Sequence, residues 1–388
     1  MGTQHFFDSY DAGGNPLSIT DAEFQTTSYA YDDRGLKVQT TYPDHHAGAV
    51  VGSPGYGITQ CSYDAINRRS ICTGQAGDTQ SFNYDLAGRL LSRGYRTAAN
   101  SPSGAIVDTD IFTYDQSSRM LTAASGRYGN TCANTCAMTY AAAGRKQEES
   151  LTVGGQIYTT TVGYDTASRQ NQMIYPNGTI LNRTYTDRGQ LEQLTYDGNV
   201  VDTRNYDDGG RLISSALGNG ITDSRAYNSD NTLASISSSN ADIGTYSYTW
   251  DENRNKTSET ITGALTAYSF TTGATGYDSE DRLTAYTRGS LSQNWDLSLE
   301  GDWNTFTENG VIENRTHGPA HEVNTLGNSA VTHDVKGNVT SKPSSLNPAD
   351  ISTLTWDLDN RLTSVDTDND GTADATYTYD AMRPYFQE

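Results

Sequence analysis

An acidic stretch near the C-terminal end of the chain, DTDNDGTAD, has the residue spacing of a calcium-binding loop. Carboxylates at positions 1, 3 and 5, a glycine at 6, a carbonyl at 7 and an acid at 9 can surround one hard cation. Tyr377 stands at position 12, where an EF-hand needs a bidentate glutamate, so we predict a stand-alone DxDxDG loop between strands. The candidate ligands are Asp366, Asp368, Asp370, the carbonyl of Thr372 and Asp374.

The alternative for this loop is an acidic turn without a cation, in which solvent screens the repulsion between carboxylates. We expect calcium to bind weakly, toward the extracellular millimolar range, because one ligand is missing. Calcium should then raise the melting temperature, and Asp368→Ala should remove that rise. No other cofactor is expected.

Four cysteines form two local pairs. Cys61 and Cys72 flank one predicted hairpin on the same face, diagonally offset in the simplest register, and Cys132 and Cys136 share a short loop. We interpret them as two disulfides of an extracellular protein, in preference to four free thiols. A zinc site is disfavoured because no histidine is near either pair in the sequence.

Two tryptophans, Trp295 and Trp303, lie in the aromatic stretch WDLSLEGDWNTF and can be read in two ways. Exposed rings would form a platform for a glycan, whereas buried rings would be core where the sheet bends. We favour core, since more rings are needed for burial than for ligands. His317 and His321 have the spacing of a helical metal pair, but the intervening Gly318 and Pro319 disfavour a helix.

Tyrosine and aspartate stand side by side many times, and with His or Arg they could act as acid and base on a polysaccharide. A catalytic group is needed once, however, and this dipeptide recurs along most of the chain. The sequence contains no nucleophile elbow, phosphate-binding glycine loop or HExxH motif. We therefore predict a non-catalytic protein and assign no catalytic residue.

The element that positions these groups is a repeat. Tyr185, Tyr206 and Tyr227 are 21 residues apart, and looser copies carry an equivalent aromatic along the chain. Two turns per period and no helical pattern make each unit two strands. The other repeat aromatics are Tyr31, Tyr63, Tyr84, Tyr114, Tyr140, Tyr164, Trp250, Tyr277, Trp356 and Tyr379.

Each unit reads as a β-hairpin. In FNYDLAGRLLS, Phe82 and Tyr84 share one face of a strand, and Asp85 with Gly88 closes a four-residue turn. That loop length predicts that Arg89 faces Tyr84 across the hairpin and lies on its ring, worth about 0.5–1 kcal/mol. An arginine follows the aromatic by five positions at Arg68, Arg89, Arg119, Arg145, Arg169, Arg211, Arg282 and Arg361.

These YD-x-x-GRL units resemble the YD repeats of the Rhs family, whose relatives include insecticidal toxin-complex shell proteins and teneurins. The resemblance extends from Tyr29 to Tyr379. It implies an all-β fold in which successive antiparallel hairpins join one long curved or spiralling sheet, forming a hollow shell or part of one. It also implies that such a shell often encloses a C-terminal toxin segment.

The composition agrees with an ordered sheet that has solvent on much of both faces. Only 34% of the 388 residues are apolar, but 26 tyrosines can be buried while their hydroxyls stay hydrated, and prolines number only 9. The net charge of −21 disfavours nucleic-acid binding, which needs clustered Lys and Arg. There is no apolar run long enough for a membrane span and no signal peptide at Met1.

We predict one array over residues 1–388, with a degenerate first unit (1–28), repeats (29–365), the acidic loop (366–376) and a truncated last unit (377–388). The expected role is structural, as the wall of a larger secreted or surface toxin-type protein whose payload is absent here. An extracellular glycan-binding or adhesin surface ranks second, and a polysaccharide-acting enzyme third. Expected partners are the rest of a larger polypeptide, an enclosed segment, glycans, or another copy through an open sheet edge.

Overall fold

A computed structural model describes residues 6–43, 57–97, 105–126, 134–153, 155–273, 275–344, 350–379 and 381. Its regular structure is almost entirely antiparallel β, in a 29-stranded sheet and a separate 5-stranded sheet. One 3-10 turn, η2 (Gly263–Tyr268), interrupts the described strands. In the parts of the chain that are described, no helix is long and apolar enough to cross a membrane.

The strands of the large sheet follow the chain in order, each paired with the next. They are β1 (Phe6–Tyr10), β2 (Pro16–Thr20), β3 (Thr26–Tyr31), β4 (Lys37–Thr41), β5 (Ile58–Tyr63), β6 (Arg69–Thr73), β7 (Thr79–Tyr84), β8 (Leu90–Arg96), β9 (Asp108–Tyr114), β10 (Met120–Ser125), β11 (Asn134–Tyr140), β12 (Lys146–Val153), β13 (Gln156–Tyr164), β14 (Gln170–Ile174), β15 (Ile180–Tyr185), β16 (Leu191–Tyr196), β17 (Asn199–Tyr206), β18 (Leu212–Leu217), β19 (Thr222–Tyr227), β20 (Leu233–Ser238), β21 (Thr245–Trp250), β22 (Lys256–Ile261), β23 (Phe270–Thr271), β24 (Ala285–Arg288), β25 (Leu291–Leu297), β26 (Trp303–Glu308), β27 (Val311–His317), β28 (Val323–Leu326) and β29 (Ser329–Ala330). The small sheet consists of β30 (Thr332–His333), β31 (Val339–Pro343), β32 (Ile351–Trp356), β33 (Leu362–Asp366) and β34 (Ala375–Thr376).

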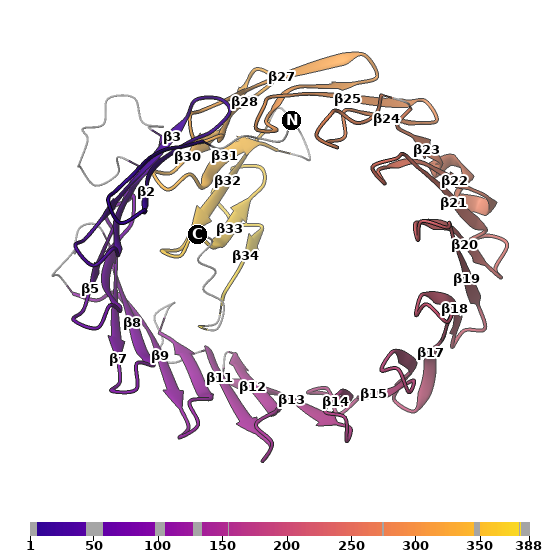
Figure 1. Ribbon diagram of the computed structural model, residues 1–388, viewed down its shortest axis with the longest axis horizontal. Helices are drawn as coiled ribbons and strands as arrows, with labels where there is room; N and C mark the ends of the chain where they lie inside the picture. The colour runs from indigo at the N-terminus through magenta and orange to yellow at the C-terminus, as the bar shows by residue number, and fades with distance from the viewer. Residues whose placement is uncertain are drawn as a thin grey trace.

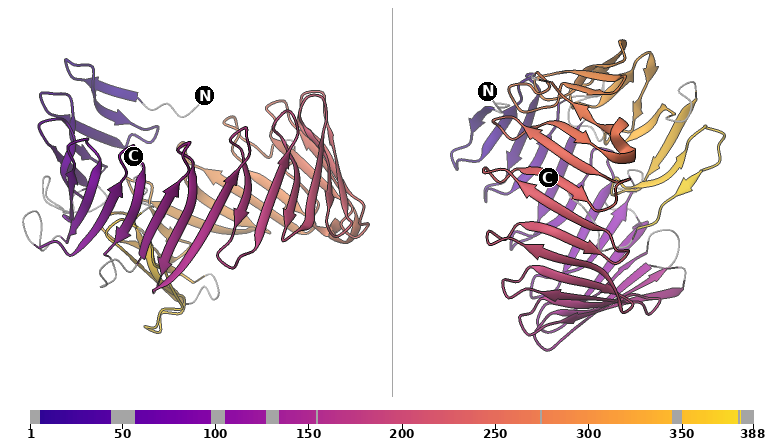
Figure 2. Two further views of the ribbon diagram at one scale, coloured as in Figure 1. Left: turned by 90° about the horizontal axis from the view of Figure 1, so that it is seen from below. Right: turned by 90° about the vertical axis from the view of Figure 1, so that its right-hand side faces the viewer.

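The large sheet curves into a ring, as Figure 1 shows, and β32–β34 fall within its outline in that view. The side views of Figure 2 place these C-terminal strands at one open end of the ring, where they extend past the rim. In the side views of Figure 2 the strands run obliquely along a wall that is one sheet thick. The all-β class and the long curved antiparallel sheet are thus as predicted. The break between β29 and β30, which divides the described strands into two sheets, was not predicted.

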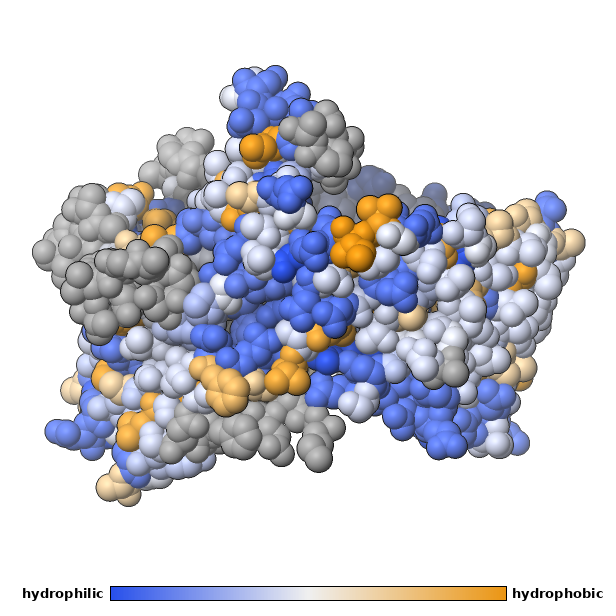
Figure 3. Space-filling model, turned by 90° about the horizontal axis from the view of Figure 1, so that it is seen from above, coloured by the Kyte–Doolittle hydropathy of each residue, from blue (hydrophilic) through white to orange (hydrophobic). Residues whose placement is uncertain are grey.

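A wall of this kind has little room for a buried core. Most side chains of the regular units are half-buried, because a single curved sheet keeps water close to both of its faces. Figure 3 shows the result on one face, where apolar residues appear as small separate spots among hydrophilic ones. Fully buried apolar residues gather instead on β8–β11, and among them Phe112 and Ala123 pack with Ala381 near the end of the chain.

Candidate functional site

In most units the turn that follows the repeat aromatic is shaped by an aspartate. In the unit of Tyr206, Asp207 Oδ1 accepts the backbone N–H of Arg211 at 2.8 Å, and Oδ2 accepts its Nε at 2.7 Å. These two hydrogen bonds, the backbone one first, lower the pKa of Asp207. Gly210 completes the turn at a φ of 84°, which glycine adopts without steric cost. The turn therefore fixes the position of its own arginine.

That arginine reaches the next unit, not its own. The Arg211 guanidinium lies 4.9 Å from the centre of the Tyr227 ring, one repeat further along. The same contact joins Arg68 to Tyr84, Arg89 to Tyr114, Arg119 to Tyr140, Arg145 to Tyr164, Arg169 to Tyr185 and Arg361 to Tyr379. Arg282 has no ring to contact there, because Leu297 stands in the place of the next aromatic, and it donates to the carbonyl of Ser298 at 3.0 Å.

The predicted stacking of Arg89 on Tyr84 within one hairpin is therefore wrong. Asp85 and Arg89 close the turn, since the Asp85 N–H donates to the Arg89 carbonyl at 3.0 Å. A bulge next to Tyr84 then places that ring opposite Leu90. Periodicity revealed the pair of residue types but could not reveal that one residue belongs to the neighbouring hairpin.

The repeat aromatics contact the preceding unit, whereas the arginines contact the following one. The Tyr206 hydroxyl donates to the carbonyl of Leu191 in the preceding unit at 2.7 Å, and the Trp250 indole N–H does the same to Leu233. Equivalent bonds are made by Tyr31, Tyr63, Tyr114, Tyr140, Tyr164, Tyr185, Tyr227, Tyr277, Trp356 and Tyr379. Each of these units is thus tied to the one before it by a hydrogen bond, and where an arginine and a ring are both present, by a cation–π contact.

We expect Tyr206→Phe to lower the free energy of unfolding by about 0.5–1.5 kcal/mol, because the Leu191 carbonyl loses its side-chain donor. The loss of stability is measured by denaturant titration, with hydrogen exchange of β16–β18 as the probe. Tyr246→Phe is the matched control: this half-buried ring lies on β21, and no hydrogen bond of its hydroxyl is found among the described residues. Equal effects of the two substitutions would refute the bracing role of Tyr206.

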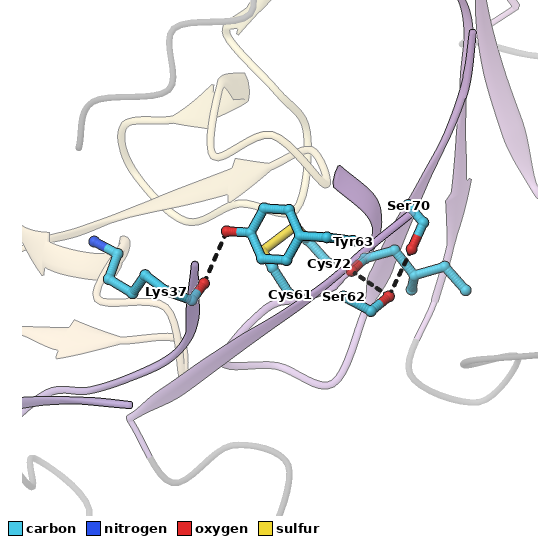
Figure 4. The surroundings of a disulfide bond; sticks show 7 residues. Lys37, Cys61, Ser62, Tyr63, Ser70 and Cys72 are labelled. Atoms are coloured by element: carbon cyan, nitrogen blue, oxygen red, sulfur yellow. Dashed lines mark hydrogen bonds between the residues drawn. A yellow bond between two sulfur atoms is a disulfide. The ribbon is translucent and has the colours of Figure 1, made fainter. Parts of the chain in front are cut away.

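The structure joins Cys61 and Cys72 in a disulfide across the β5–β6 hairpin (Figure 4). The two residues are direct cross-strand partners, so the predicted diagonal offset is wrong. A bulge beside Tyr63 shifts the register by one residue. In the same hairpin the Tyr63 hydroxyl donates to the Lys37 carbonyl at 2.8 Å. Cys136 is buried on β11, whereas Cys132 lies outside the described residues, so their pairing stays a prediction.

The two ends of the ring meet through their turns. The β2–β3 turn of the first unit lies against the turns before β26 and β28, where the Ala22 N–H donates to Glu300 at 2.7 Å. His321 joins both sides, with Nδ1 2.7 Å from Asp302 and Nε2 3.0 Å from Asp21. His317 ends β27 in the place of a repeat aromatic, and His321 takes the positive-φ place of the turn glycine. The pair is not helical, as the intervening Gly318 and Pro319 indicated.

His321 should make this junction sensitive to alkali. Partial burial lowers its pKa, but hydrogen bonds and charges from Asp302 and Asp21 outweigh this and raise the pKa from 6.5 to about 9. Because the folded pKa exceeds the unfolded one, the stabilisation is complete below pH 6.5 and is lost as the pH rises through about 9. We expect the stabilisation from the protonated His321 to be about 1–2 kcal/mol after allowance for solvent screening.

The measurement is the stability difference between the wild type and His321→Asn across this pH range, since asparagine tolerates the positive φ of 63°. The difference should shrink steadily above neutral pH. A difference that is unchanged between pH 6.5 and pH 10 would show that the imidazolium does not hold the junction.

A second junction holds the small sheet against the wall. Arg93 on β8 donates to Asp110 on β9 at 2.6 Å, and Asp359, from the turn after β32, lies 3.6 Å from the same guanidinium. The Tyr95 hydroxyl is within hydrogen-bonding distance of both carboxylates, at 2.9 and 3.1 Å. Lys336 contributes a further ion pair to Asp78 at 3.0 Å. Arg93 and Tyr95 meet Asp110 on the adjacent strand, but the contacts of Asp359 with Tyr95 and of Lys336 with Asp78 span 264 and 258 positions, and no local motif predicted them.

The two tryptophans pack with each other and with Phe306. Ring centres of Trp295 and Trp303 are 5.8 Å apart, and each lies within 5.9 Å of the centre of Phe306. Trp303 remains 39% exposed, and the Arg315 guanidinium lies 4.5 Å from the centre of its ring. The cluster therefore combines partial burial with one accessible ring.

The acidic stretch forms the return loop between β33 and β34. Oxygens of Asp366, Asp368 and Asp374 lie within 4.8 Å of one another. Asp370 accepts the N–H of Thr372 at 2.7 Å, which shapes the turn. The flanking strands pair antiparallel, as expected for a stand-alone loop and not for an EF-hand.

Comparisons with known proteins agree with this geometry. The family described as RHS Repeat matches residues 10–47. No curated protein is similar enough in sequence to count as a match.

Solved structures share the fold at low sequence identity. A crystal structure of TcdB2-TccC3 without its hypervariable C-terminal region matches at 16% identity with a TM-score of 0.76, covering 98% of this chain and 21% of that chain. The Tc holotoxin pore of Photorhabdus luminescens matches at 16% identity with a TM-score of 0.73, covering 96% and 21%. The chain thus spans about a fifth of the solved chains it matches. The predicted resemblance to the Rhs/YD-repeat family and the predicted shell-type fold are confirmed.

Proposed function

We propose that this chain is a non-catalytic wall segment of an Rhs/YD-repeat shell, within a larger secreted or surface toxin-type protein that encloses a C-terminal payload. The observation that carries the proposal is the direction of the chain. After circling in β1–β29 it turns inward, and Ala381 packs on Phe112 and Ala123 of the wall. A segment continuing from that position would begin inside the ring.

The distribution of contacts supports a structural role. The same tyrosine, arginine and aspartate contacts recur in most units, whereas the contacts of His321 join the two ends of the wall and those around Arg93 join the wall to the small sheet. The ion pairs of His321 therefore serve closure of the ring, and the buried ion pair of Arg93 serves attachment of the small sheet. The Cys61–Cys72 disulfide supports an oxidising, extracellular location.

The proposal is tested on the native gene product by intact mass measurement and limited proteolysis. We expect a polypeptide longer than 388 residues whose additional C-terminal segment resists protease while the wall is folded. The segment should become cleavable after denaturation. A product that ends at Glu388, or a continuation that is cut as fast as a free peptide, would overturn the enclosure.

A glycan-binding surface is the second candidate, favoured by the accessible ring of Trp303 in its aromatic cluster. A glycan array with the wild type and Trp303→Ala tests it. Selective binding that is lost in the variant would favour a binder, and binding to no glycan would remove this candidate. A polysaccharide-acting enzyme ranks third, because the tyrosine–aspartate pairs that it would use shape the turns of most units.

A further inference from the structure

We propose that the loop Asp366–Asp374 is a calcium site that ties the end of β33 to the start of β34. The inference is independent of the shell function, because it concerns a single return loop. That loop differs from the return turns of the regular units, which close within about five residues, as between Leu217 and Ile221. The insertion brings acidic residues to one place without adding apolar contacts.

The first observation is the cluster itself. Carboxylate oxygens of Asp366, Asp368 and Asp374 lie within 4.8 Å of one another. No lysine or arginine forms an ion pair with any of the three in the part of the chain that the structure describes. Three negative charges so close together repel one another, and a divalent cation would remove that repulsion.

The second observation is the burial of Asp366, which is only 7% exposed. Its Oδ2 accepts the Gly371 N–H at 2.9 Å, whereas its Oδ1 has no hydrogen-bond partner among the described atoms. Burying an unpaired carboxylate oxygen is costly unless a cation or donor compensates it. A solvated acidic turn would not need to bury this residue, so the burial points to a ligand.

The backbone of the loop is already arranged for coordination. Gly371 has a φ of 88° and Asn369 a φ of 58°, which produce the sharp turn around the cluster. Asp374 is held in place by Thr367, whose N–H donates to Oδ2 at 2.7 Å.

The donor set selects calcium. All donors are oxygens, and no histidine or cysteine belongs to the cluster, which suits a hard cation that takes six to eight oxygen ligands. Asp366, Asp368 and Asp374 form the centre of the site, and Asp370, the Thr372 carbonyl and water would complete it. Because the position-12 glutamate is missing, affinity should be in the range of about 0.1–1 mM.

The test measures the melting temperature and the heat of titration of the full chain with CaCl₂ alone, after treatment with EDTA. At about ten times the dissociation constant, we expect the wild type to melt roughly 2 °C higher than in EDTA. Titration should saturate at one calcium per chain. Magnesium at the same concentration should have little effect, because it requires a tighter octahedral shell.

Asp368→Ala should abolish the calcium response and leave the melting temperature in EDTA equal or slightly higher, since one repelling charge is gone. The matched control is Asp187→Ala, which removes an exposed turn carboxylate from a regular unit and should keep the full response. A wild type without a saturable calcium response, or a response retained in Asp368→Ala, would overturn the proposal. Neither result bears on enclosure of a payload.

Discussion

Replacing Asp110 with alanine is expected to lower the free energy of unfolding by about 3–5 kcal/mol, because it leaves the Arg93 guanidinium buried without its main partner. Arg93 is 3% exposed and Asp110 is 1% exposed, so solvent cannot replace the lost contact. The Tyr95 hydroxyl loses an acceptor at the same time. We expect β8 and β9 to lose protection and the small sheet to detach from the wall.

Hydrogen exchange is the appropriate measurement, since a repeat array can unfold in parts and need not give a single transition. The control is Asp208→Ala, which removes an exposed turn carboxylate and should change the free energy of unfolding by less than about 0.5 kcal/mol. The double variant Arg93→Met with Asp110→Leu should recover part of the loss, because both charges of this pair are gone while Asp359 keeps the Tyr95 hydroxyl as a donor. A single variant as stable as the control would refute the pinning role of the ion pair.

Replacing Cys61 and Cys72 together with serine is expected to cost about 2–3 kcal/mol. The disulfide closes a loop with a sequence separation of 11 residues, which restricts the unfolded chain. Under oxidising conditions the melting temperature of the wild type should exceed that of the double variant. A reducing agent should lower the wild-type value to that of the variant and leave the variant unchanged. A wild type that does not respond to reduction would contradict a stabilising disulfide.

The sequence predicted the repeat unit well because its signals are local. Alternation of Phe82 and Tyr84, the Asp85 turn and the 21-residue spacing each depend on a few neighbouring residues, and these determine a hairpin. Units without an aromatic, at Leu297 and His317, were missed for the same reason: their turns have the same hydrogen bonds, but the marker residue is absent. The acidic loop was found because its spacing is also local.

Contacts between units were not predictable from one sequence. The partner of Arg89 proved to be Tyr114 in the next hairpin, which depends on a bulge and on the lateral position of neighbouring strands. The junctions of His321 with Asp21 and of Asp359 with Tyr95 depend on the curvature summed over the whole ring. Small changes in twist per strand would separate these residues. The total curvature of the ring cannot be predicted from any local residue pattern.

Small-angle X-ray scattering of the purified chain tests most directly whether the hairpins add side by side into a closed ring. We expect a scattering profile and pair-distance distribution that match the ring-shaped wall of Figure 1, with the small sheet held against it. The profile of a solid globule, or of an open extended sheet whose ends do not meet, would contradict it.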